Sequence, residues 1–280
     1  MNSPANTALE QFISETVSND TRQARQLERR QKMVEAVITS GSIRIEDLAE
    51  QFETSLMTVH RDLDELSRRG LLRKDRGVAT VMPTSLSESS DAYRVGLHTR
   101  EKKQIARTAL EYLETGSTVL LDDSTTVMQL VPFLQQKAPL TIVTNSINVM
   151  NAVRDMDDIK LIGLGGEYYN WCNAFLGHST VNELENVRVD TVFVSISAII
   201  GGVAFHQSPV IVETKLAMLK SATRKVLLAD HSKFQQRALH RFAALTDFDF
   251  LITDSRTEAS CIEGLRAEGV TVRVARKESE

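Results

Sequence analysis

The first third of the chain places apolar residues at helical spacing in three segments. Residues 22–39, 45–52 and 55–69 each carry hydrophobic side chains three or four positions apart, which predicts three amphipathic helices. Ser55, which opens the third segment, is a preferred N-cap residue. Residues 71–81 form two short runs that meet near Arg76-Gly77, and they predict a small β-hairpin.

The remainder of the chain alternates between short β-branched runs and helical patterns. The runs that predict strands are residues 118–121, 140–143, 159–162, 191–195, 225–229, 250–253 and 270–274. The helical patterns between them include residues 99–114, 146–155, 210–222 and 258–268. Strand–helix alternation of this kind predicts βαβ crossovers and an α/β fold with a mainly parallel sheet.

These patterns divide the chain of 280 residues into four parts. Residues 1–21 are predicted to be a polar extension, and residues 22–82 hold the three helices and the hairpin. Residues 83–98 contain a proline and several serines without a clean period, so they are predicted to be a linker. Residues 99–280 then form the larger α/β domain. Two domains agree with the usual range of about 100–200 residues per domain.

Composition narrows the class of protein. Hydrophobic residues make up 42% and charged residues 25%, which excludes a wholly disordered or collagen-like chain. The sequence contains no run of eighteen apolar residues, so no membrane span is predicted. Residues 1–20 lack the pattern of a secretory signal. Cys172 and Cys261 stand 89 residues apart without a Cys-x-x-Cys spacing, so we expect free thiols in a cytoplasmic protein and no metal site. No cofactor and no membrane partner are expected.

The early helices and hairpin indicate a winged helix-turn-helix that binds double-stranded DNA. The net charge is −4, but residues 21–80 carry 12 Lys and Arg against 10 Asp and Glu, so this segment is the one suited to phosphates. The third helix would lie in a major groove, where an arginine can bond to a guanine edge or a phosphate. The expected contacts are Ser55, Met57, Thr58, His60 and Arg61 from the helix and Arg73, Lys74 and Arg76 from the hairpin. The alternative is a surface helix with merely solvated charges.

Polar residues in the larger domain gather where predicted strands end. Asp122, Asp123, Ser124, Thr125 and Thr126 follow one strand, Thr144, Asn145 and Ser146 follow the next, and Gly165 and Gly166 follow the third. Ligands of open α/β sheets bind at this edge, and helix N-termini there favour a phosphate. The alternative for each loop alone is simple helix capping.

Both halves resemble the DeoR family of bacterial repressors. The N-terminal motifs are Ile45-Glu-Asp-Leu-Ala-Glu-Gln-Phe52 and Ser55-Leu-Met-Thr-Val-His-Arg-Asp-Leu63. The C-terminal motifs are Glu101-Lys102, Asp122-x-x-Thr125-Thr126, Val143-Thr-Asn-Ser146, Gly165-Gly166, Glu213-Thr-Lys215 and Leu228-Ala-Asp-His-Ser-Lys-Phe234. The chain departs from the family at His60, where an arginine is usual, and at Arg76-Gly77-Val78, where the hairpin usually reads His-Gly-Gly.

The resemblance implies a repressor of sugar-metabolism genes whose larger domain has the fold of ribose-phosphate isomerases and CoA transferases. It implies a phosphorylated-sugar effector, held through its phosphate by Thr125 and Thr126. Asp122, Asn145 and Glu213 would bind sugar hydroxyls, and Lys233, in the motif that includes Asp230, would supply positive charge. Lys215 would pair with Glu213 or stand exposed on the helix. A homodimer or homotetramer is expected, because dimers usually read such operators.

Two other functions remain open from the sequence. A sugar-phosphate isomerase would use Asp122, Glu213 and Lys233 to move a proton, although likeness of fold does not carry chemistry. A DNA-binding scaffold with an inactive pocket is the other.

Position 123 is a further departure from the family, whose phosphate loop usually reads Asp-Ser-Gly-Thr-Thr. Here Asp123 replaces the serine and Ser124 replaces the glycine. At about 6 Å from a phosphate, Asp123 would add roughly 3 kcal/mol of repulsion per unit charge at an effective dielectric constant near 20. Asp123 would then select a ligand with a hydroxyl or amine beside it. Alternatively, Asp123 caps the following helix and points away.

Overall fold

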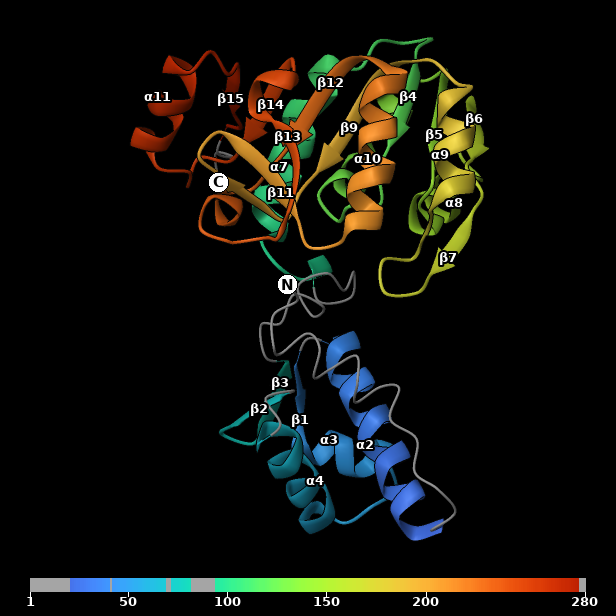
Figure 1. Ribbon diagram of the computed structural model, residues 1–280. Coiled ribbons are helices and arrows are strands. Elements are labelled where there is room, and N and C mark those ends of the chain that lie inside the picture. Colours follow the sequence, from blue (N-terminus) through green and yellow to red (C-terminus); the bar gives the residue numbers. More distant parts are fainter. Residues whose placement is uncertain (1–20, 41, 69–71, 82–93, 277–280) are drawn as a thin grey trace. The chain divides into compact units, whose positions relative to one another are not determined.

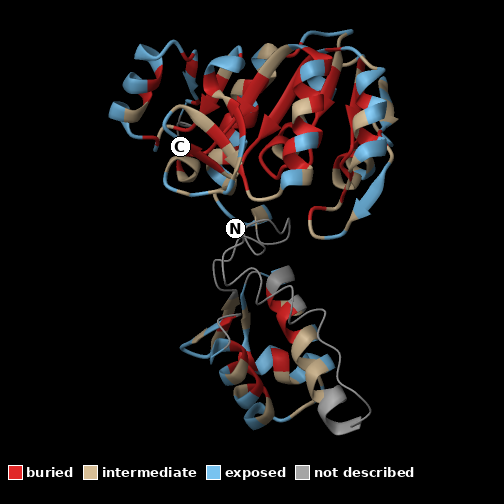
Figure 2. Ribbon diagram, in the orientation of Figure 1, coloured by how far each residue is buried: buried red, intermediate tan, exposed pale blue. Residues whose placement is uncertain are grey.

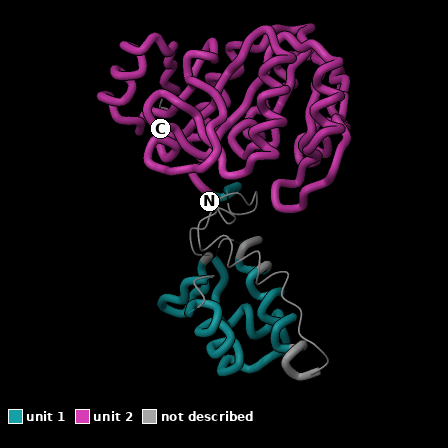
Figure 3. The backbone as a smooth tube through the Cα atoms, viewed as in Figure 1, with its two compact units in different colours: residues 1–96 teal, residues 97–280 magenta. Residues whose placement is uncertain are grey.

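The computed structural model describes residues 21–40, 42–68, 72–81 and 94–276. The chain forms two compact units, residues 1–96 and residues 97–280 (Figure 3). The predicted extension, apart from Thr21, and residues 83–93 of the predicted linker lie outside the described residues. Each unit is considered by itself below.

The smaller unit is a winged helix-turn-helix, as predicted (Figure 1). Its helices are α2 (Thr21–Ser40), α3 (Ile45–Gln51) and α4 (Leu56–Arg68). The predicted hairpin consists of β2 (Leu72–Asp75) and β3 (Val78–Val81), and β1 (Ser42–Arg44) adds a strand in the order β1-β3-β2. The sequence analysis missed β1, because it has three residues and only Ile43 carries a large apolar side chain.

The apolar positions that predicted these helices meet in one core. Leu48 of α3 and Val59, Leu63 and Leu66 of α4 are fully buried with Met33 of α2. The helical spacing of the apolar residues therefore places one face of each helix inward and leaves the polar face outward.

The larger unit is built on a parallel sheet, as predicted. Its strands are β4 (Thr118–Leu121), β5 (Leu140–Thr144), β6 (Ile159–Gly163), β9 (Val189–Ser195), β12 (Ala222–Leu228), β14 (Phe250–Thr253) and β15 (Val272–Val274). Their order is β15-β14-β12-β9-β4-β5-β6, and every neighbouring pair is parallel. All carboxyl ends therefore meet at one edge of the sheet.

Helices cover both faces of this sheet. α7 (Thr99–Ala109), η2 (Val127–Lys137) and α8 (Ile147–Val153) pack on one face, and α9 (His178–Glu185), α10 (Pro209–Ser221) and α11 (Ala259–Ala267) pack on the other. Leu120 packs into the core beneath α9, α10 and α11. Its neighbours Val119 and Leu121 pack into the core beneath α7, η2 and α8, because successive strand residues point to opposite faces. The central strands β4, β5 and β9 are accordingly largely buried, whereas the edge strands β6 and β15 are partly exposed (Figure 2).

Several short elements were not predicted. β7 (Glu167–Tyr169) and β8 (Ala174–Leu176) form a hairpin, and β10 (Ala198–Ile200), β11 (Val203–His206) and β13 (His240–Ala244) form a separate antiparallel sheet. Short 3-10 turns η1 (Leu110–Tyr112), η3 (His231–Phe234) and η4 (Leu245–Asp247) complete the unit. Within the described residues, no helix is long and apolar enough to cross a membrane.

Candidate functional site

The predicted DNA-reading side chains lie on one side of α4. Met57 is 70% exposed and Arg61 is exposed, whereas Val59 and Leu63 are buried. His60 is half-buried. This arrangement leaves Arg61 able to reach a base or phosphate without breaking the core.

Ser55 begins α4 as its cap. The N–H of Thr58 donates to Ser55 Oγ at 3.2 Å, and the two hydroxyls lie 2.8 Å apart. Ser55 remains exposed and Thr58 is half-buried. The hydroxyls therefore order the first turn of α4, and the exposed side of Ser55 remains open to a phosphate.

The hairpin places its basic side chains at an exposed turn. Arg76 and Gly77 both have positive φ, 45° and 79°, which is the backbone of a two-residue type I′ turn. Arg73 and Arg76 are exposed, but Lys74 donates to Asp64 of α4 at 2.6 Å. Lys74 therefore joins the wing to the recognition helix as well as adding positive charge.

Asp62 holds α4 against α2, and the sequence analysis missed this contact. The carboxylate is 1% exposed and accepts hydrogen bonds from Arg29 at 2.6 and 2.8 Å and from Arg30 at 2.7 Å. Its neighbour Arg61 faces solvent instead. One position along the helix thus separates a structural carboxylate from an exposed arginine.

The register of the parallel strands brings the predicted ligand-binding loops together. Leu121 of β4 pairs with Thr144 of β5, so Asp122 and Asn145 follow side by side. On the other side Leu121 pairs with Phe193 of β9. All predicted residues of these two loops are buried, namely Asp122, Asp123, Ser124, Thr125, Thr126, Thr144, Asn145 and Ser146.

Asp122 is the centre of a buried hydrogen-bond network. Its Oδ1 accepts from the N–H of Ser124 at 2.9 Å and from the Ser124 hydroxyl. Its Oδ2 accepts from the N–H of Ser195 at 2.8 Å and from the ammonium group of Lys215. The two oxygens are thus occupied by protein donors.

Lys215 departs from both sequence-based expectations. It is 2% exposed, and it contacts Asp122 and the carbonyl of Ser195 (2.9 Å) rather than Glu213. Glu213 is exposed on the other side of α10, where it lines a groove with α9. Residues two apart on a helix do not face each other, so the expected Lys215–Glu213 pair was wrong.

A second group of charges lies at the same edge. Lys102 of α7 is 3% exposed, and its Nζ donates to Thr125 Oγ1 at 3.0 Å. Lys102 belongs to the Glu101-Lys102 motif but was not among the predicted site residues. Lys233 is half-buried on η3 and donates to Gln236 at 3.3 Å.

Asp230 lies among these cations. Burial by itself raises the pKa of this carboxyl. The charge of Lys233 and the hydrogen bond from Ser232 lower it, and the charges of His98 and Lys102 act in the same direction. The net pKa lies below the ordinary value of 3.8, so Asp230 is an anion at neutral pH.

Among the described residues, three buried side-chain oxygens have no hydrogen-bond partner. They are Asp123 Oδ1, Asn145 Oδ1 and Asp230 Oδ2. Ser124, not Asp123, caps the following turn, because Val127 N–H donates to Ser124 Oγ at 3.3 Å. That segment, η2, is a 3-10 helix. The capping alternative for Asp123 was therefore wrong.

Gly165 is bonded to α9, and Gly166 packs against the same helix. The N–H of Gly165 donates to Glu183 at 2.9 Å, and its carbonyl accepts from Thr180 at 2.7 Å. A Cβ on Gly166, whose φ is 148°, would lie 2.2 Å from Thr180 Oγ1. Close packing therefore explains Gly166, whereas a Cβ on Gly165 would meet Glu183 only at an ordinary 3.7 Å.

The hairpin that includes Trp171 packs beside Asn145. Asn145 Nδ2 donates to the carbonyl of Phe175, and the N–H of Phe175 donates to the carbonyl of Asn145, both at 2.9 Å. Cys172 is buried with Ile211 of α10. The hairpin is thus a packed connection that orients a site residue.

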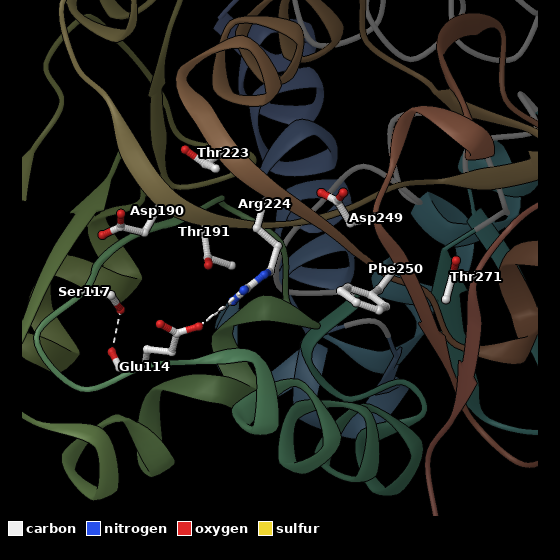
Figure 4. Close-up of a pocket in the computed structure, with 9 residues that line it drawn as sticks. All are labelled: Glu114, Ser117, Asp190, Thr191, Thr223, Arg224, Asp249, Phe250 and Thr271. Atoms are coloured by element: carbon white, nitrogen blue, oxygen red, sulfur yellow. Dashed lines mark hydrogen bonds and ion pairs between the residues drawn. The ribbon is translucent and has the colours of Figure 1, made fainter.

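A second hollow lies at the opposite edge of the sheet. A cavity of about 550 Å³ lies at the amino ends of the same strands (Figure 4). Its charged groups already pair with protein: Arg224 with Glu114 at 3.3 Å, and Asp190 with the N–H of Thr118 at 2.8 Å. This cavity therefore offers a ligand fewer available charged groups than the carboxyl edge of the sheet does.

One group of possible metal ligands occurs in the described part of the chain. Ligand atoms of His98, Asp230 and His231 lie within 4.8 Å of one another. Lys102 and Lys233 place positive charge beside Asp230, which opposes a cation there. The arrangement therefore favours an anionic ligand, and the predicted absence of a metal site stays a prediction.

Comparison with known proteins identifies the family of the chain. Residues 29–84 match the family described as "DeoR-like helix-turn-helix domain", and residues 97–255 match "DeoR C terminal sensor domain". The glycerol-3-phosphate regulon repressor of Escherichia coli K12 is 30% identical over 246 residues, which cover 86% of this chain and 96% of that protein. The lactose phosphotransferase system repressor of Lactococcus lactis is 30% identical over 239 residues, which cover 84% and 93%.

A ribose 5-phosphate isomerase from Methanocaldococcus jannaschii is similar at 16% identity and a TM-score of 0.35, with 48% of this chain and 53% of that chain covered. No conclusion is drawn from that low similarity. The match of both domains in order, with the winged helix-turn-helix and the sensor-domain motifs in place, shows that the chain belongs to the DeoR family of DNA-binding transcriptional regulators.

Proposed function

We propose that this regulator is a repressor whose affinity for operator DNA is controlled by a phosphorylated sugar bound at the carboxyl edge of the larger unit. Residues 22–82 would bind DNA and residues 99–280 would bind the effector. Coupling between such sites typically amounts to about 1–3 kcal/mol. The protein would act as a homodimer or homotetramer on a two-fold operator.

One observation carries the proposal. Buried oxygens of Asp123, Asn145 and Asp230 lack hydrogen-bond partners among the described residues, at an edge that also holds Lys102 and Lys233. Buried polar atoms are almost always hydrogen-bonded in native proteins. Acceptors and cations gathered at a sheet edge where ligands bind support a ligand with both hydroxyl donors and an anionic group.

The phosphate would bind at the cationic end of this site. Lys102, Thr125 and Lys233 supply positive charge and a hydroxyl, and Thr126 lies in the same buried loop. Asn145 would accept from a sugar hydroxyl. The proposed site excludes Glu213, which is exposed on α10, and Gly165 and Gly166, which contact α9.

An isomerase is supported less well. The carboxylate proposed to move a proton, Asp122, already accepts hydrogen bonds at both oxygens, and Glu213 is exposed on another face. A general base needs a free oxygen within reach of the proton it removes. The set Asp122, Glu213 and Lys233 is therefore not assembled for this chemistry.

The test begins with an operator selected from a random DNA pool by the full-length protein. Binding of that operator is then titrated with a panel of pentose, hexose and triose phosphates and with the same sugars without phosphate. A phosphorylated sugar is expected to change operator affinity by about 5–150-fold, the range of a 1–3 kcal/mol coupling. Equal operator affinity with and without every member of the panel would refute effector control by this class of ligand.

A further inference from the structure

The unpartnered oxygens are all hydrogen-bond acceptors, which constrains the effector. The Nδ2 group of Asn145 donates to the carbonyl of Phe175 at 2.9 Å, so Oδ1 is the group left for a ligand. The carboxylate of Asp123 accepts only. A ligand at this end of the site must therefore donate hydrogen bonds.

Asp123 also carries charge that the protein balances incompletely. Lys215 is the cation beside it, and Lys215 Nζ lies 3.6 Å from Asp123 Oδ1, beyond hydrogen-bond distance. That ammonium group already donates to Asp122 and to the carbonyl of Ser195. One buried cation thus serves two buried carboxylates. A buried charge without a paired partner is costly, so a cation from the ligand stabilises this arrangement.

A ligand ammonium group fits better than a hydroxyl. It carries three donors, whereas a hydroxyl has one, so it can bond both Asp123 Oδ1 and Asn145 Oδ1. Its charge also balances the second carboxylate. Asp123 follows β4 and Asn145 follows the neighbouring strand β5, so the two acceptors belong to adjacent loops at the same edge of the sheet.

The phosphate end lies at a suitable distance. Asp230 and Lys233 follow β12, and β9 lies between β12 and β4. Two strand spacings amount to about 10 Å, which is the length scale of a hexose phosphate. Phosphate at Lys233 and ammonium at Asp123 would then occupy opposite ends of one ligand.

We propose, on the basis of the proposed function above, that the effector is an amino-sugar phosphate whose protonated amine bonds to Asp123 and Asn145. Asp123 is the residue that determines this specificity.

The experiment compares matched ligands by calorimetry on the full-length protein. Glucosamine 6-phosphate is paired with glucose 6-phosphate, and galactosamine 6-phosphate with galactose 6-phosphate, so that each pair differs by amine against hydroxyl. The wild type is expected to bind one amine at least about 10-fold more tightly than its hydroxyl partner, because charge-assisted hydrogen bonds are stronger than neutral ones. Asp123→Asn and Asp123→Ser should reduce this preference to less than about twofold.

Glu263→Gln is the matched control, since it also removes one carboxylate charge but lies exposed on α11, outside the site. It should keep the preference. Retained preference in both Asp123 variants, or equal binding of amine and hydroxyl by the wild type, would overturn the inference while leaving a sugar-phosphate effector intact. If the wild type binds neither member of either pair, and no sugar phosphate changes operator binding, the proposed function fails as well. Unchanged melting of the ligand-free variants will show that they fold.

Discussion

Replacing Asp62 should destabilise the DNA-binding unit while sparing the larger one. Asp62→Ala removes three charge-assisted hydrogen bonds and leaves two guanidinium groups without their carboxylate. Breaking a buried ion pair costs about 3–5 kcal/mol. Arg29 and Arg30 keep 27% and 16% of their side-chain surface exposed, so water can solvate them in part. We therefore expect a loss of about 3 kcal/mol, the lower end of that range.

Asp64→Ala provides the comparison on the same helix. Asp64 also forms an ion pair, with Lys74 at 2.6 Å, but its side chain is 65% exposed. Exposed pairs contribute about 0–1 kcal/mol, so this variant should remain close to the wild type. The two variants thus share the residue type and the helix and differ in burial.

Hydrogen exchange measured by mass spectrometry separates the units, because peptides from residues 56–68 report on α4 alone. Asp62→Ala should lower the free energy of opening of α4 by about 3 kcal/mol. The melting temperature of a unit this small should then fall by more than about 10 °C. The single tryptophan, Trp171, lies in the larger unit, so its fluorescence should show an unchanged transition. Equal destabilisation by Asp62→Ala and Asp64→Ala would refute the assignment of burial as the cause.

Three further predictions concern DNA, ligand and pH. Arg61→Ala should weaken binding to the selected operator by about 1–3 kcal/mol and relax preference at one base pair, measured by competition titration; equal loss on random DNA would make it a phosphate contact. Lys233→Ala should abolish the effect of the sugar phosphate while operator affinity without ligand stays at the wild-type value; a large drop in the latter would show that the sites are not separate. Folding lowers the pKa of Asp230 below 3.8, so its contribution to stability is present above that pH and is lost as pH falls through the lowered value. The difference in melting temperature between wild type and Asp230→Asn should accordingly shrink from about pH 6 to about pH 3. A difference that stays constant with pH would contradict this prediction.

The fold was predictable wherever one periodicity extended over a whole element. Apolar spacing located α4, and β-branched runs located each strand of the parallel sheet. The three-residue strands β1, β7 and β8 escaped because they contain too few positions to show a period. Their pairing depends on partners distant in the chain, such as β3 for β1.

The residues gathered at the sheet edge were predictable, but their internal pairing was not. Strand ends pointed to Asp122 and Asn145, since all carboxyl ends of a parallel sheet meet, and the family resemblance pointed to Asp230. Lys102 escaped because it lies on α7, distant in the chain from Thr125. The partner of Lys215 depends on the side of α10 on which this lysine lies. Because α10 is apolar on nearly every side, the sequence did not show which face of the helix is buried.

The loop after β4 shows why one position can decide the ligand. Asp122 has both oxygens bonded to protein donors, Ser124 caps the next turn, and Thr125 accepts from Lys102. These residues hold the loop and its charges in place, and most of their bonding capacity is used within the protein. Asp123 keeps a buried oxygen without a hydrogen bond among the described residues. Because the neighbouring side chains build the candidate site while Asp123 leaves an acceptor free, we expect replacement of this one residue to change which ligand fits without dismantling the loop.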